Sequence, residues 1–155
     1  RPLFTYGGSK EAVVLGAEPA SDVALVKVLQ GRPADEDVAE SLAVVQRAYL
    51  ESATPDRSIR TLKRKVMRRE PQLVQMSVNY HNDVQRSLIE TLAGRLEADF
   101  DQDVAHDLAT VAIYDMFATA RATFALSLNH DIDLFEALTR INAYRADGLL
   151  AFSRV

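Results

Sequence analysis

Apolar residues recur every three or four positions along most of this chain, which is the spacing of one face of an α-helix. The longest seam runs from residue 71 to about 98 and consists of Leu73, Met76, Tyr80, Val84, Leu88, Leu92 and Leu96. No stretch sustains the alternation of apolar and polar residues that is typical of a strand. The pattern therefore predicts an all-α protein.

Glycine and proline divide this pattern into separate helices. Gly31-Arg32-Pro33, Thr54-Pro55 and Glu70-Pro71 are breaks of the kind that end one helix and begin the next. The predicted helices span 22–30, 35–53, a short segment with Ile59, Leu62 and Val66, and 71–98, followed by two more. The first of these two starts at Asp101 or Asp103 and ends near 129, and the last starts at Asp131 or Asp133 and reaches Phe152.

Length and composition narrow the class of protein. A chain of 155 residues is long enough for one domain with a sizeable core. It has no cysteine, which excludes disulfides, thiol catalysis and thiolate metal sites, and fits a cytoplasmic protein. No apolar run approaches the roughly 20 residues of a membrane span, and no signal-peptide pattern is present.

The formal net charge of −4 argues against a chain that binds nucleic acid along its whole length. Any contact with DNA must then be local. Because the chain begins with Arg1 rather than methionine, we expect an N-terminal portion to precede it.

The N-terminal residues contain the most distinctive motif. The aromatic pair Phe4 and Tyr6 is followed by a glycine turn and by Ser9-Lys10-Glu11, which opens an apolar helix. Serine caps a helix start, and a glutamate in the first turn interacts favourably with the helix dipole. Lysine at this positive end is unusual unless an anion such as phosphate lies nearby. An ordinary capped helix after a turn is the alternative.

This segment resembles the end of the DNA-binding region of TetR-family transcriptional regulators. The residues that carry the resemblance are Phe4, Tyr6, Ser9, Lys10 and Glu11, whereas Gly7 stands where the family usually has a phenylalanine. The resemblance implies that Tyr6 and Lys10 contact the DNA backbone. It also implies that residues 1–16 end a helix-turn-helix domain.

By the same resemblance, residues 17–155 form a TetR-like helical regulatory domain that binds an effector and dimerises through its two C-terminal helices. The order of the predicted helices agrees with that architecture. The implied protein is a repressor released from operator DNA by a small, largely apolar effector of an acyl or aromatic kind. The alternative is a helical ligand-binding or protein-interaction module without a DNA role, and a helical enzyme comes third.

The two C-terminal helices are apolar over more than one face, which requires a second buried surface. Our hypothesis is a two-fold homodimer through residues of about 104–128 and 132–152. The interface residues expected are Val104, Leu108, Val111, Phe124, Leu138, Ile141, Leu149 and Phe152. The core of a monomer is the alternative.

Aromatic residues, methionines and a few polar groups from three predicted helices suggest an apolar effector pocket. They are Tyr49, Met76, Tyr80, His81, Tyr114, Asp115, Met116 and Phe117. Asp115 stands in an apolar run, and a buried carboxylate needs a cationic, hydroxyl or ligand partner. A salt bridge, to Arg121 or across the dimer, would satisfy it equally well.

A basic run follows the second break and consists of Arg57, Arg60, Lys63, Arg64, Lys65, Arg68 and Arg69. A solvated helix face explains it. The alternatives are an electrostatic contribution to DNA binding or contact with an acidic head-group.

Enzymatic and metal-binding motifs are absent from the sequence, so we expect no catalytic residue, cofactor or metal. His81, His106 and His130 are far apart, and Asp103-x-x-His106 is better explained as a solvated first helical turn. There is no glycine-rich phosphate loop, nucleophile elbow or HExxH motif.

Overall fold

The computed structural model describes residues 19–52, 65–66 and 69–146, with side chains described for all of these except 19–23, 71 and 73–81. Five helices with defined bounds lie in these ranges, and the described residues contain no strand. They are α3 (Pro19–Gln30), α4 (Val38–Ser52), α6 (Pro71–Leu96), α7 (Gln102–His130) and α8 (Leu134–Ala146). The predicted all-α class is confirmed. None of the helices in this part of the chain has the length and apolarity that crossing a membrane requires.

Aspartate caps place two helix starts. The Ala39 amide donates to Asp37 Oδ1 at 2.7 Å, so α4 begins at Val38, three residues later than the sequence suggested. The amide of Phe135 donates to Asp133 Oδ1 at 2.7 Å, which selects Asp133 of the two candidate caps for α8. Each carboxylate satisfies amide groups that have no partner inside the helix.

Proline defines the start of α6 as predicted. Pro71 is the first residue of this helix and Glu70 precedes it, which matches the predicted break and restart. The missing amide of proline costs nothing at this position, where it would have no partner inside the helix.

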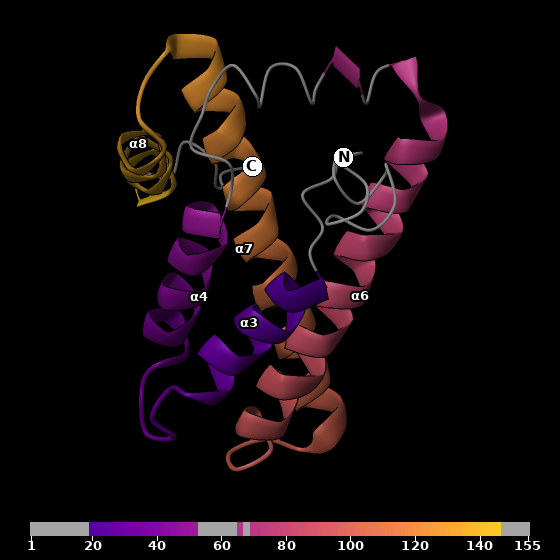
Figure 1. Ribbon diagram of the computed structural model, residues 1–155. Coiled ribbons are helices and arrows are strands. Elements are labelled where there is room, and N and C mark those ends of the chain that lie inside the picture. Colours follow the sequence, from indigo (N-terminus) through magenta and orange to yellow (C-terminus); the bar gives the residue numbers. More distant parts are fainter. Residues whose placement is uncertain (1–18, 53–64, 67–68, 147–155) are drawn as a thin grey trace, which may run out of the picture. The chain divides into compact units, whose positions relative to one another are not determined.

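The chain divides into two compact units, residues 1–113 and 114–155, with the boundary inside α7. In the first unit, α3 packs against both α4 and α6 (Figure 1). Leu25 and Leu29 of α3 are buried, as is Leu92 of α6. The other large apolar residues buried in this unit are Val45, Leu50, Val84, Leu88, Ile89 and Ile113.

The second unit comprises the remainder of α7 and α8. Leu134, Ala137 and Ile141 are buried at a spacing of three and four residues, so α8 buries one stripe. The turn before α8 contains Asp131, which has a φ of 58°. Aspartate tolerates this left-handed conformation better than most residues do. Ser127 Oγ closes the turn by donating to the carbonyl oxygen of Ile132 at 2.7 Å.

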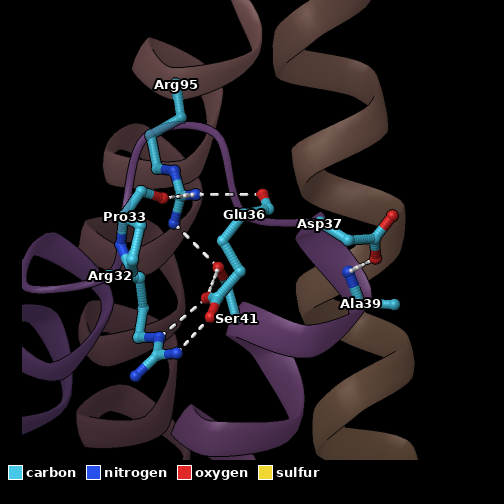
Figure 2. Close-up of polar contacts among 7 residues, drawn as sticks. All are labelled: Arg32, Pro33, Glu36, Asp37, Ala39, Ser41 and Arg95. Atoms are coloured by element: carbon cyan, nitrogen blue, oxygen red, sulfur yellow. Dashed lines mark hydrogen bonds and ion pairs between the residues drawn. The ribbon is translucent and has the colours of Figure 1, made fainter.

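The loop between α3 and α4 is held by a polar network around Glu36 (Figure 2). Arg32 Nε donates to one oxygen of Glu36 at 2.7 Å, and Arg32 Nη2 pairs with the other oxygen. Ser41 Oγ, in the first turn of α4, donates to the same carboxylate at 2.6 Å. Because Ser41 is fully buried, its hydroxyl would be costly without these partners.

Arg95 of α6 connects this network to a neighbouring helix (Figure 2). Its Nη1 donates to Ser41 Oγ at 3.0 Å, and its Nη2 donates to the carbonyl oxygen of Pro33 at 2.8 Å. The guanidinium therefore hydrogen-bonds both the loop and the start of α4. Its planar arrangement of donors suits two acceptors at once, which the single ammonium of lysine would not reproduce.

The charge of Glu36 makes this network sensitive to acid. Hydrogen bonds from Arg32, the largest cause, and from Ser41 together hold the pKa of Glu36 at about 2, below its ordinary value of 4.5. The unfolded chain thus binds this proton more readily than the folded one does. The contribution of Glu36 to the free energy of unfolding is fully present above its pKa in the unfolded chain, 4.5, and is lost as the pH falls from 4.5 towards 2.

We predict that Glu36→Gln removes part of the acid sensitivity of folding. The difference in free energy of unfolding between wild type and this variant should shrink as the pH is lowered from about 5 to 2. Urea unfolding followed by circular dichroism measures it. Arg32→Gln should flatten the profile similarly, because it removes the main cause of the lowered pKa. Identical pH slopes in all three proteins would contradict this account.

Candidate functional site

The four predicted pocket residues on α7 do not share one environment. Tyr114 is 51% exposed and Asp115 is also exposed, whereas Met116 and Phe117 are buried. Consecutive residues on a helix point in different directions, so one face holds only part of such a run. Met116 and Phe117 belong to the buried face, together with Ala120 and Thr123.

Asp115 has a cationic partner in its own unit, which is Arg145 of α8. Arg145 Nη2 donates to Asp115 Oδ2 at 2.5 Å, and its Nη1 donates to Thr119 Oγ1 at 2.6 Å. Asp115 thus forms the salt bridge that was the alternative to a ligand, but with Arg145 rather than with Arg121 or a second copy. The expected burial is wrong, because the Asp115 side chain is 52% exposed.

This contact has a structural consequence. Asp115 and Thr119 lie one turn apart on α7, so one guanidinium spans two successive turns and holds α8 to them. The ion pair accounts for the charge of Asp115 without a ligand.

The other predicted pocket residues lie in the first unit. Tyr49 is half-buried on α4. Met76, Tyr80 and His81 lie on α6, but their side chains are outside the described residues. The assembly of these residues with those of α7 into one pocket stays a prediction.

The predicted dimer residues differ in exposure. Val104, Leu108 and Val111 are 45%, 43% and 69% exposed on the first half of α7. Phe124 and Leu138 are half-buried and Ile141 is buried, while Leu149 and Phe152 lie outside the described residues. Large apolar side chains so exposed on one helix mark a surface that a partner could cover.

The predicted DNA contacts Tyr6 and Lys10 lie outside the described residues. Of the basic run, only Lys65 and Arg69 have described side chains, and both are exposed. Asp103 and His106 are exposed in the first turns of α7. Where the structure describes side chains, no three histidine, aspartate or glutamate groups are placed to hold a metal ion.

Sequence reasoning did not single out the loop between α6 and α7. An open hollow of about 410 Å³ lies here, lined by Glu97, Ala98, Asp99, Phe100, Asp101 and Val104. Phe100 is 45% exposed, which is unusual for a large aromatic residue. A signal was present, because the chain has five carboxylates and no lysine or arginine from Glu97 to Ile113.

A scan of the chain against models of known protein families finds no match, and neither does a search of curated protein sequences. The likeness of residues 4–11 to TetR-family regulators therefore stays a prediction from the sequence.

We predict that Arg145 contributes more to stability than the neighbouring Arg140. Both lie on α8, but Arg140 makes only an exposed pair with Glu136, one turn away. Arg145→Met should lower the free energy of unfolding by about 1 kcal/mol, since it removes two hydrogen bonds between helices. Arg140→Met should cost about 0.3 kcal/mol, as exposed pairs do. Urea unfolding measures both, and equal losses would show that the contact with Asp115 and Thr119 contributes nothing special.

Proposed function

We propose that this protein is a cytoplasmic, DNA-binding transcriptional regulator of the TetR type, a repressor without enzymatic activity. The observation that carries the proposal is the motif formed by Phe4, Tyr6, Ser9, Lys10 and Glu11, followed by a chain whose described part is helical. In this proposal, the N-terminal residues contact operator DNA and the later helices form the sensor. The net charge of −4 agrees with a DNA contact confined to one end.

The proposed mechanism is a shift between two populations of a homodimer. Two-fold symmetry presents two recognition helices to the two halves of a pseudo-palindromic operator. An effector that binds better to a state with a different spacing of these helices lowers operator affinity by that difference in binding free energy. No direct contact between effector and DNA is needed.

The homodimer is supported by the exposed apolar side chains on α7. Val111 is the most exposed of them, at 69%. Covering such residues in a dimer removes apolar surface from water, which stabilises the dimer by about 25 cal/mol for each Å² buried. The proposed effector is apolar, in keeping with the buried Met116 and Phe117 and with the aromatic composition of the predicted pocket.

The rival is a helical interaction module without a DNA role. One observation favours it. At the start of α7, exposed apolar residues lie next to carboxylates and not next to cations, which suits a protein partner better than DNA. Binding to DNA discriminates between the two classes.

We predict that the full-length gene product enriches a pseudo-palindromic sequence from a random pool of DNA duplexes. Lys10→Gln and Tyr6→Phe should weaken binding to all sequences alike, because backbone contacts carry no sequence information. Lys10→Gln should also reduce the slope of log affinity against log salt by about 1. Lys27→Gln, an exposed lysine on α3, is the matched control. Failure to enrich any sequence would favour the rival.

We predict that native mass spectrometry of the 17.2 kDa chain shows a dimer. Val111→Asp should convert it to a monomer, since a charge buried at an interface without a partner is costly. Val44→Asp, at an exposed apolar position on α4, should leave the dimer intact. A co-purified small molecule in the same spectrum would identify the effector. A wild-type monomer at micromolar concentration would contradict the proposed dimer.

A further inference from the structure

Three exposed apolar side chains lie among five carboxylates where α6 passes into α7. Phe100, Val104 and Leu108 are each 43–45% exposed. Val104 and Leu108 are one turn apart on α7 and so lie on the same side of the helix, while Phe100 lies in the loop just before it. We call this surface the acidic stripe and define it as Glu97, Asp99, Phe100, Asp101, Asp103, Val104, Asp107 and Leu108. Every one of these residues is exposed.

The charge of the acidic stripe is not balanced locally. No lysine or arginine occurs between Glu97 and Ile113, and none of the five carboxylates forms an ion pair with any residue that the structure describes. Neighbouring like charges repel each other, and an added cationic partner would relieve that repulsion.

Helix capping explains only part of this pattern. Asp101 and Asp103 stand at the N-terminus of α7, where the helix dipole favours a negative charge. Glu97 is the C-cap of α6, and Asp99 follows it closely. A negative charge at the C-terminal end of a helix is unfavourable, so local stability does not account for these two residues.

We propose that the acidic stripe is a docking surface for a basic amphipathic helix of another protein. The apolar face of that helix covers Val104 and Leu108, and its lysine or arginine side chains lie over the carboxylates. One lysine or arginine of the partner helix enters the hollow, where its cationic group meets the carboxylates of Glu97 and Asp99 and the ring of Phe100. Amphipathic helices bind protein surfaces in this way, through apolar side chains spaced by three or four residues.

A second copy of the same surface fits less well. Pairing the acidic stripe with itself would bring ten carboxylates together without a lysine or arginine from either stripe, and like charges across an interface disfavour binding. The inference goes beyond the proposed regulator and needs neither DNA nor an effector. It assigns Val104 and Leu108, which sequence reasoning placed in the dimer interface, to a different partner and leaves Val111 to the dimer.

The test uses the full chain and a fluorescein-labelled helical peptide of leucine and lysine, with the leucines at a spacing of three and four. Its counterpart has glutamate in place of every lysine. Fluorescence anisotropy should show saturable binding of the lysine peptide, weakened at higher salt, and no binding of the glutamate peptide.

Two sets of variants locate the binding. Asp103→Asn with Asp107→Asn should weaken the lysine peptide about tenfold, and Val104→Ser with Leu108→Ser should do the same. The controls are Asp83→Asn with Glu90→Gln on α6 and Val44→Ser on α4, which are exposed residues outside the stripe. They should change the affinity less than twofold.

Three results would overturn the inference. One is that the lysine peptide does not bind, and another is that the controls weaken it as much as the stripe variants do. The third is that Val104→Ser with Leu108→Ser turns a dimer into a monomer in sedimentation, which assigns the stripe to a second copy and supports the proposed dimer instead. If the wild-type protein binds the lysine peptide but no DNA sequence, the proposed function is overturned and the docking surface is not.

Discussion

The packing of α3 against α4 and α6 is the interaction on which the first unit depends. A helix of only 12 residues is marginal in water, so α3 requires the burial of Leu25 and Leu29 to persist. That burial needs α4 to fold back beside α3, and the loop between them must therefore be held in place. Arg95 does so from α6 by hydrogen-bonding Pro33 and Ser41, so one guanidinium holds both the loop and the start of α4 to α6.

The two halves of helix α7 bury different kinds of residue. In the first unit α7 buries the small residues Ala105 and Ala109, followed by Ile113. Because alanine side chains are short, a neighbouring backbone can approach α7 closely at these two positions. In the second unit it buries Met116 and Phe117 and uses Asp115 and Thr119 to bind Arg145. Its exposed side carries the apolar residues that a monomer leaves in water. This helix of 29 residues therefore exposes apolar side chains that no described residue covers and that a partner could cover.

Two different partners are proposed for two separate parts of the chain. The proposed DNA contact is confined to a few residues around Tyr6 and Lys10, while the negative charge of the carboxylates from Glu97 to Asp107 disfavours nucleic acid and favours cations. A regulator built in this way would keep its sensor domain away from DNA by charge and offer the acidic stripe to a basic partner. An interaction module would need only the second of these features.

The helical class and several helix starts could be predicted from the amino-acid sequence, because periodicity and capping are local properties. Proline and aspartate placed the beginnings of α6 and α8 correctly. The apolar run around Asp115 suggested a buried carboxylate, which was wrong, although a salt bridge was among the partners expected for it. That the partner is Arg145, 30 residues away, and that the carboxylate lies at the surface depend on how α8 packs beside α7, which no local pattern encodes. The tertiary structure also decided which apolar residues of α7 are buried, since a helix that is apolar on several sides does not reveal which side packs inward.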